Sequence, residues 1–376
     1  MSQLGESAQL AMDTLLQKPV QGVPPFWVNI MEHSVIERLA GAQPGEYVAS
    51  PERVYLASQR GLGICAIDQW IPENPLMMGA QGFEDRERTA TTGAERIVRD
   101  GVVIDSPESV VEHLENFAFP SLRKRIAEFD EEKRVREIID RERAVQALFG
   151  PDILKTGHEF VSYPYLEYWR YGYEAYFMAY ALYPELMEKH FALQADLALL
   201  NNTASARAYR EANLPILYRL DHDMADSRGM LVNIVSLDRI WFPHFARCLQ
   251  PMLKTGVRLL WHCDGNLMQM VPRLLEVGFS GFQGFQYEDG MDYEKICRMK
   301  TKDGRSLIVV AGVSVTRTLP HGSPDDVRRE MRWLVDQGPR TGLFLSASSS
   351  VAPGVPWDNI RVFADGLKYY RTHGRG

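Results

Sequence analysis

A histidine and an aspartate lie two residues apart at the end of a short apolar run, residues 258–261. Such a run predicts a β-strand, in which alternate side chains point to the same face. His262 and Asp264 would then share one face, while Cys263 between them would point away. A histidine and a carboxylate side by side can bind a metal ion, transfer a proton or hold a polar substrate. The same two residues could also form a simple hydrogen bond that caps the strand end.

Two further aspartates follow another apolar run that predicts a strand. Asp221 and Asp223 would share a face, with His222 on the opposite one. Two carboxyl groups at one site can shift each other's pKa values and act as a general acid and a general base. Ion pairs with Arg219 or Arg228 would explain the same aspartates without a catalytic role. The candidate catalytic residues are therefore Asp221, Asp223, His262 and Asp264.

Several other polar and aromatic side chains lie at or near predicted strand ends and could contact a substrate. An aromatic-walled pocket would suit a methoxylated aromatic compound or a macrocycle, although ordinary core packing explains aromatic clusters as well. A serine run before the last helix could bind an anion or form a polar loop. The candidate substrate-binding residues are Asp68, Gln69, Trp70, Tyr163, Tyr165, His222, Gln286, Glu288 and Ser349.

The composition predicts a soluble, core-forming protein. The chain has 376 residues, 45% of them hydrophobic and 24% charged, and a formal net charge of -7. No basic block with interleaved aromatic residues is present, so nucleic acid is not an expected partner. No apolar run approaches the roughly 20 residues of a membrane span, and the N-terminus lacks the pattern of a signal peptide. The four cysteines form no CxxC pair, which favours reduced thiols in a cytoplasmic protein.

Apolar runs alternate with helical patterns along the chain, which predicts a parallel α/β fold. About eight such runs favour a (β/α)8 TIM barrel, with functional groups at the C-terminal strand ends. A doubly wound sheet is the alternative, but it would usually bring a glycine-rich phosphate turn after its first strand, and residues 31–34 do not form one. The predicted strands lie at residues 24–31, 63–67, 160–165, 214–220, 258–262, 279–286, 306–313 and 343–346.

Residues 80–150 interrupt this alternation. Residues 91–104 predict a hairpin with an Asp-Gly turn, and residues 122–148 carry many charged side chains at helical spacing, which indicates a solvated helix face. We expect one domain over residues 1–376, a distorted barrel with a helical N-terminal extension. Residues 80–150 would be an insertion after the second strand that serves as a lid or a dimer element. The protein would be a monomer or a homodimer.

Five short motifs in the second half of the chain carry a family resemblance: Asp221-His222-Asp223-Met224-Ala225, His262-Cys263-Asp264-Gly265-Asn266, Gly278-Phe279, Gly312-Val313-Ser314 and the closing stretch Ser349 to Ile360. With these motifs the chain resembles the uroporphyrinogen decarboxylase superfamily. This superfamily includes the tetrapyrrole decarboxylase and the corrinoid-linked methyltransferases. The resemblance covers residues 160–372 well and the N-terminal part weakly, and it implies a distorted (β/α)8 barrel.

The methyltransferase branch of the superfamily binds zinc through a His-x-Cys motif after the fifth strand and a cysteine after the eighth. The resemblance places His262 and Asp264 at the first two ligand positions and Ser349 at the third. It therefore implies a harder oxygen and nitrogen site for zinc, made by His262, Asp264 and either Glu288 or Asp223. It also implies a corrinoid (cobalamin) as methyl carrier, either as a cofactor or on a partner corrinoid protein.

The decarboxylase branch binds substrate carboxylates with a pair of arginines after the first strand. Only Arg38 is present there, and Asp68 lies near the position of the family's pyrrole-binding aspartate. We therefore expect methyl transfer between a small donor, such as an aryl methyl ether or a methylamine-like compound, and a corrinoid. Decarboxylation of uroporphyrinogen or another carboxylated substrate is the alternative. A non-catalytic subunit that binds a corrinoid or a substrate is a second alternative.

Overall fold

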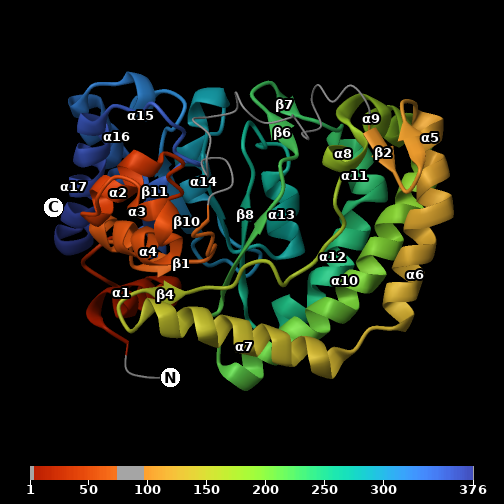
Figure 1. The fold of residues 1–376 in the computed structure, drawn as a ribbon, viewed down its shortest axis with the longest axis horizontal. Coiled ribbons are helices and arrows are strands. Elements are labelled where there is room, and N and C mark those ends of the chain that lie inside the picture. Colours follow the sequence, from red (N-terminus) through yellow and green to blue (C-terminus); the bar gives the residue numbers. More distant parts are fainter. Residues whose placement is uncertain (1–3, 74–96, 376) are drawn as a thin grey trace.

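Five parallel strands form the main sheet of the protein (Figure 1), in a computed structural model that describes residues 4–73 and 97–375. Their side chains are almost all buried and mostly apolar, as expected for a parallel sheet covered on both faces. In spatial order the strands are β11 (Leu343–Ala347), β10 (Ile308–Val313), β9 (Gly281–Gln283), β8 (Arg258–His262) and β5 (Leu217–Asp221).

The sheet continues beyond these five strands only in short pieces. Strands β1 (Ala66–Ile67) and β4 (Leu154–Lys155) pair in parallel, and isolated parallel bridges join Pro25 to Leu345, Phe26 to Ala66 and Gly157 to Tyr218. The pairing therefore runs around a TIM-barrel-like core, but continuous ladders do not close it. The expected strand at residues 24–31 is reduced to bridges, since Pro24 and Pro25 have no N–H group to donate to a ladder.

The third strand was expected at residues 160–165, and the structure corrects this. The strand that occupies this place is β4, six residues earlier in the chain. Side chains, rather than a neighbouring strand, accept most of the backbone N–H groups here. Phe160 and Val161 donate to the Tyr218 hydroxyl, and Ser162 donates to Asn202. Because side chains bond these N–H groups, the segment at residues 160–165 joins no strand.

Helices cover the outside of the sheet. Within residues 4–73 and 97–375, none of them combines the length and the apolar character that a membrane span requires. A capping box between Ser323 and Asp326 begins α16, as the sequence there suggests. These helices are α1 (Glu6–Leu15), α2 (His33–Ala40), α3 (Glu46–Ala49), α4 (Pro51–Leu62), α11 (Ile234–Ile240), α12 (Phe242–Lys254), α13 (Val271–Val277), α14 (Tyr293–Arg298), α15 (Thr318–His321), α16 (Pro324–Gln337) and α17 (Trp357–His373).

A hairpin and a group of helices build an arm beside the sheet (Figure 1), while β6 (Ala225–Asp226) and β7 (Gly229–Met230) form a separate small hairpin after β5. A hairpin of β2 (Ile97–Arg99) and β3 (Val102–Ile104) confirms the predicted turn, while residues 80–96 lie outside the described residues. The charged region forms two helices rather than one, because the chain breaks at residues 128–130. The arm contains α5 (Pro107–His113), a π-helical turn (Leu114–Ala118), α6 (Phe119–Ala127), α7 (Glu131–Phe149), α8 (Tyr168–Tyr171), α9 (Tyr173–Leu182) and α10 (Pro184–Ala212).

A buried ion pair fixes the arm to the sheet. Lys155 on β4 places its Nζ 3.0 Å from a carboxylate oxygen of Glu142 on α7, and it also donates to the carbonyl of Thr156. The two charged side chains are only 5% and 4% exposed. A buried charge without its partner is costly, so this pair holds α7 at one position along β4.

Candidate functional site

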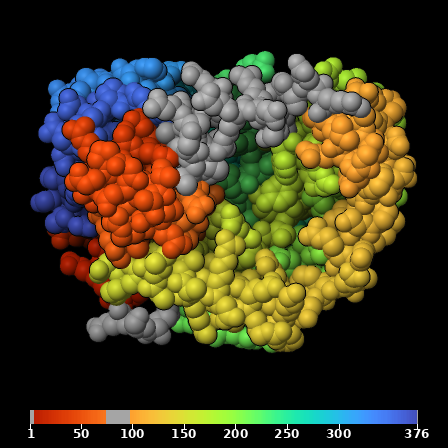
Figure 2. Space-filling view, viewed as in Figure 1, coloured from red at the N-terminus to blue at the C-terminus, as the bar shows by residue number. Residues whose placement is uncertain are grey.

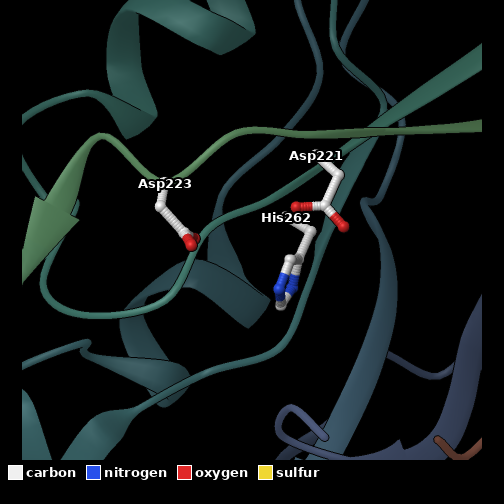
Figure 3. A group of neighbouring side chains, drawn as sticks. All are labelled: Asp221, Asp223 and His262. Atoms are coloured by element: carbon white, nitrogen blue, oxygen red, sulfur yellow. The ribbon is translucent and has the colours of Figure 1, made fainter. Parts of the chain in front are cut away.

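Three side chains that could bind a metal ion converge where β5 and β8 end (Figure 3). Asp221 is the last residue of β5, Asp223 follows two residues later, and His262 is the last residue of β8. One carboxylate oxygen from each aspartate and one imidazole nitrogen all lie within 4.8 Å of one another. The strand-end positions predicted from sequence thus come together at one edge of the sheet.

The His262 imidazole has a defined orientation. Its Nδ1 lies 3.2 Å from the backbone carbonyl of Gln283 on β9. A carbonyl oxygen can only accept, so Nδ1 carries the proton, and in the neutral ring Nε2 keeps a free lone pair. The side chain is only 9% exposed, and Nε2 lies 3.9 Å from Asp264 Oδ1. A histidine held by a carbonyl in this way is prepared to bind a metal ion or to accept a proton through Nε2.

Asp264 lies beside this group. Its backbone N–H donates to Asp223 Oδ1 over 3.1 Å, and its Oδ2 accepts from the Ser349 hydroxyl over 3.1 Å. Its Oδ1 is buried and has no hydrogen-bond partner in the described part of the chain. Ser349 therefore lies at the site and holds Asp264 in place. The fourth candidate, Glu288, has one carboxylate oxygen bonded to the hydroxyls of Ser314 and Thr316, and it does not belong to the group of convergent ligand atoms.

The two aspartates of the group have opposite pKa shifts. Burial alone would raise the pKa of Asp221, but the neighbouring His262 and Arg219 outweigh it and lower the pKa below its usual value. Burial raises the pKa of Asp223, and the neighbouring charge of Asp264 raises it further. A pair of carboxyl groups with diverging pKa values can divide the roles of ionised ligand and proton donor.

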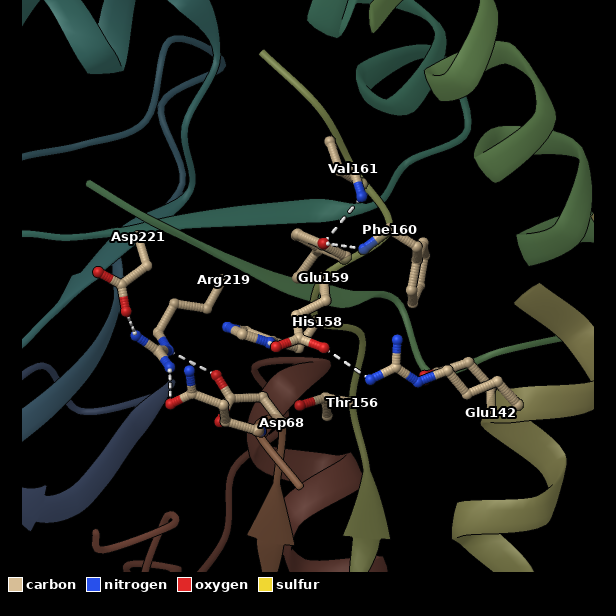
Figure 4. A network of polar contacts seen from close by, with 12 residues as sticks. Asp68, Glu142, Thr156, His158, Glu159, Phe160, Val161, Arg219 and Asp221 are labelled. Atoms are coloured by element: carbon tan, nitrogen blue, oxygen red, sulfur yellow. Dashed lines mark hydrogen bonds and ion pairs between the residues drawn. The ribbon is translucent and has the colours of Figure 1, made fainter. Parts of the chain in front are cut away.

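Arg219 connects Asp221 to the end of β1 (Figure 4). Its guanidinium donates to Asp221 Oδ2 over 2.8 Å, to Asp68 Oδ2, and to Gln69 Oε1 over 3.3 Å. Arg219 and Asp68 are both almost fully buried. The ion pair between Arg219 and Asp221 is thus present, and it alone could explain an aspartate at this position without a catalytic role. The same ion pair also fixes the orientation of the Asp221 carboxylate beside His262. Asp68 and Gln69 act on the site through Arg219.

His158 and Glu159 also lie near this site, and the sequence analysis missed both. They follow β4, and Figure 4 shows them beside Arg219. Burial lowers the pKa of His158 to about 4, so its imidazole is neutral at physiological pH. Glu159 has a left-handed backbone conformation, with φ of 65°, and its carboxylate pairs with Arg141 on α7 over 2.6 Å. The short strand β4 just before them was the available sequence signal for a strand end at this point. The prediction instead places the third strand at residues 160–165, after both residues.

The aromatic candidates separate into two groups. The Tyr163 hydroxyl donates to the backbone carbonyl of Asp221 over 2.8 Å, and the ring centroid of Tyr165 lies 4.3 Å from that of Tyr163. Both tyrosines line a cavity of about 240 Å³ that also reaches Asp221. Trp70 instead packs edge-on against core aromatic rings, with centroid distances of 5.7 and 5.1 Å, as ordinary core packing predicts.

Two polar candidates have structural contacts. His222 points away from the two aspartates beside it and accepts the N–H of Leu166 at its Nε2 over 3.1 Å. Burial lowers the pKa of His222 to about 3, so it is a neutral acceptor. The Gln286 side chain accepts the N–H of Gly265 and thereby holds the turn after His262. Gly265 has φ of 78° and its Cα faces the backbone of residue 226, so this turn depends on glycine.

Arg38, the one arginine present where the decarboxylase branch has its pair, does not lie at the Asp221 cavity. The Arg38 guanidinium stacks over the ring of Trp357 at 3.9 Å from its centroid. The only arginine described at the Asp221 cavity is Arg219, and its donors already bond to two carboxylates and an amide. Within the described residues, the site therefore has no unpaired arginine beside Asp221 for a carboxylated substrate.

Comparisons with known proteins relate the fold to solved structures. No protein-family model matches the chain, and no curated protein matches it either. A methyltransferase from Methanosarcina mazei is similar in structure, with a TM-score of 0.58 and 16% sequence identity over 97% of this chain and 98% of that one. A protein from Listeria monocytogenes named as a vitamin-B12-independent methionine synthase has a TM-score of 0.42 and 12% identity, over 94% and 98% of the two chains. The chain thus has a TIM-barrel-like α/β fold that a methyltransferase also adopts.

Proposed function

We propose that this protein is a methyltransferase that moves a methyl group from a small donor to a corrinoid, that Asp221 and His262 bind a divalent metal ion for this reaction, and that Asp223 beside them is the proton donor. The observation that carries the proposal is the convergence of their three ligand atoms within 4.8 Å. The fold shared with a methyltransferase is consistent with it. The position of the group at the C-terminal ends of parallel strands is where such folds carry their active sites.

The residues present fit a metal ion of borderline or hard character. An imidazole nitrogen and carboxylate oxygens suit zinc, manganese or cobalt, and zinc accepts such donors without any cysteine. The Nε2 lone pair of His262 is free because Nδ1 is bonded to the Gln283 carbonyl. The unpartnered, buried Oδ1 of Asp264 lies next to it. A metal ion bound here would act as a Lewis acid that polarises the donor's heteroatom.

The side chains of the site supply the rest of the chemistry. Arg219 orients Asp221 and keeps it ionised, so this carboxylate is a permanent ligand. Asp223 has the raised pKa and can hold a proton. When the bond between the methyl carbon and the donor oxygen breaks, that oxygen takes both electrons and needs a proton. Asp223 can supply this proton, after which the neutral alcohol or phenol leaves.

The experiment combines metal analysis with a transfer assay. The purified protein is analysed for bound metal, then mixed with cob(I)alamin and a panel of aryl methyl ethers and methylated amines, and methylation of the corrinoid is followed by absorbance. We expect a stoichiometric divalent ion and transfer from at least one donor. His262→Ala should lose both. The exposed histidine of α17 provides the matched control, since His373→Ala should keep both.

Four results would contradict the proposal. Absence of metal together with absence of transfer would remove its basis. Full transfer by His262→Ala would show that the convergent group is not the reaction centre. Carbon dioxide release from a carboxylated substrate, without methyl transfer, would identify a carboxy-lyase instead. If wild-type protein binds a corrinoid but shows no methyl transfer, the protein is a non-catalytic binding subunit.

A further inference from the structure

Two adjoining hollows lead from Asp221 toward the arm. The first is the cavity of about 240 Å³ between the ends of β4 and β5. The second is a cleft of about 670 Å³ between α6, α7 and α10. Tyr163 and Tyr165 line both, so the two hollows lie next to each other at these residues. Figure 2 shows the molecule hollowed between the orange and yellow surface of residues 100–150 and the green surface behind it.

We propose that these hollows form one binding site for a flat aromatic molecule with a single negatively charged group, oriented with its reactive end toward Asp221 and its charge at Arg125. The identification of this molecule as the methyl donor rests on the proposed function. The binding site itself rests on the shape, the aromatic floor and the charge distribution of the hollows.

The floor of the site suits an aromatic ring. Tyr165 is half-buried and lines both hollows, and its ring centroid lies 4.3 Å from that of Tyr163 and 5.5 Å from that of Trp169. Apolar side chains from the arm, Leu122 and Leu197, line the cleft around this floor. Aromatic rings favour offset or edge-on contact with other rings, and such contacts add to the gain from burial.

The inner end of the site offers polar contacts whose charged groups are paired. Asp221 shares Arg219 with Asp68 and lies 2.8 Å from it, and Glu159 pairs with Arg141 over 2.6 Å. His158 is a neutral imidazole there, and its Nδ1 lies 3.9 Å from a carboxylate oxygen of Glu159. An ether or hydroxyl oxygen fits this end, because His158 can donate to it or accept from it.

The outer end carries a guanidinium, that of Arg125, which is not held in a hydrogen bond or ion pair within the described residues. Lys133 and Arg134 lie within 4.0 and 3.5 Å of Glu137, and Arg134 also donates to Asn201 over 2.8 Å. Arg125 lines the cleft and forms no hydrogen bond or ion pair with any residue of the described ranges. Burial raises the pKa of its neighbour Glu167, and the charges of Arg170 and Arg125 oppose that rise. The donors of Arg125 have no hydrogen-bond partner within the described residues, so an anionic group of a ligand could bind them.

The test measures binding directly by calorimetry, without any corrinoid, using three probes that share a ring and differ in charge: 4-methoxybenzoate, anisole and 4-methoxybenzylamine. We expect 4-methoxybenzoate to bind about tenfold more tightly than the other two, as expected for a charge-assisted hydrogen bond. Arg125→Gln should remove this preference and leave anisole binding unchanged. Arg123→Gln is the matched control, since Arg123 is exposed on the same helix and makes no described side-chain bond.

A second variant tests the cleft itself. Leu197→Trp should fill it and weaken binding of all three probes about tenfold or more, while Leu182→Trp, at an exposed end of α9, should not. Melting curves identify any variant that fails to fold. The proposal is overturned if wild-type protein does not bind 4-methoxybenzoate, if it prefers the amine, or if Arg125→Gln and Leu197→Trp bind like wild type. Methyl transfer is assayed separately, so a failed transfer with intact binding contradicts the proposed function alone.

Discussion

Asp221 and His262 are direct partners in the parallel ladder between β5 and β8. Paired residues of neighbouring strands point to the same face at the same level, so the carboxylate and the imidazole must meet at the rim. Asp223 lies two residues further and returns to that face. A one-residue slip of either strand would turn its side chain to the other face and destroy the group. The convergence at this site is thus a consequence of sheet register.

The proton-donor role of Asp223 can be tested through the leaving group. Asp223→Asn should lower kcat about 100-fold or more for anisole, whose leaving phenol needs a proton, in line with the typical effect of a general acid. The loss should be much smaller for 4-nitroanisole, because its leaving phenolate is stable without a proton. Ser349→Ala, which removes only the hydrogen bond to Asp264, should affect both donors equally. An equal loss for both ethers in Asp223→Asn would show that Asp223 does not donate the proton.

The orienting role of Arg219 predicts a change in metal affinity. Arg219→Lys keeps a positive charge, but a single ammonium group cannot reach Asp68, Gln69 and Asp221 together. We expect metal affinity to fall about 10- to 100-fold, the usual effect of losing an outer-shell partner of a metal ligand. Gln69→Ala is the control, since it removes only the 3.3 Å contact and should change the affinity little. Competition with a chromogenic chelator measures both, and equal affinities would contradict the role.

The second half of the sheet was predictable from the sequence because its strands are continuous apolar runs. The predictions at residues 258–262, 306–313 and 343–346 agree with β8, β10 and β11 to within about two residues at each end. Parallel strands buried on both faces need such runs, so the pattern is strong there. The faces of Asp221, Asp223 and His262 followed from the two-residue period of a strand.

The first half was harder because its strands carry little local pattern. β1 and β4 have two residues each, and β4 includes the charged Lys155, whose burial depends on Glu142 on a distant helix. Tertiary contacts therefore decide where the third strand lies. Without that strand position, the sequence could not place His158, Glu159 and the Arg219 network at the site. The orientation of Glu288 likewise depends on hydroxyls of a later segment, which local spacing cannot show.

The ion pair between Lys155 and Glu142 predicts strong coupling between the arm and the sheet. Lys155→Met should destabilise the protein by about 3–5 kcal/mol, because it leaves Glu142 buried without its partner. The double variant Glu142→Leu with Lys155→Met should recover most of that loss, since no buried charge remains. Urea unfolding of the two single variants and the double variant gives the coupling energy.

An exposed pair provides the comparison for this cycle. Arg298 and Glu294 lie one helical turn apart on α14 with side chains 72% and 41% exposed, so Arg298→Ala should cost less than about 1 kcal/mol. Similar losses for Lys155→Met and Arg298→Ala would show that the pair does not attach the arm to the sheet.

Buried neutral histidines predict a loss of stability in acid. Burial lowers the pKa of His190 and His222 to about 3 and that of His158 to about 4, against about 6.5 in an unfolded chain. Below pH 6.5 the unfolded chain therefore binds more protons than the folded one, and the free energy of unfolding falls as the pH falls. Each fully neutral histidine contributes up to about 1.4 kcal/mol per pH unit over that window.

His222→Gln isolates one of these contributions. A glutamine oxygen can still accept the N–H of Leu166, but it does not titrate. Urea unfolding at pH 7.5, 6.5, 5.5 and 4.5 should show a shallower decline for His222→Gln than for wild type below pH 6.5, and no difference in slope above it. His373→Gln, at an exposed position, should follow the wild-type slope throughout. Parallel curves for wild type and His222→Gln would mean that His222 is protonated in the folded protein, against the burial that the structure shows.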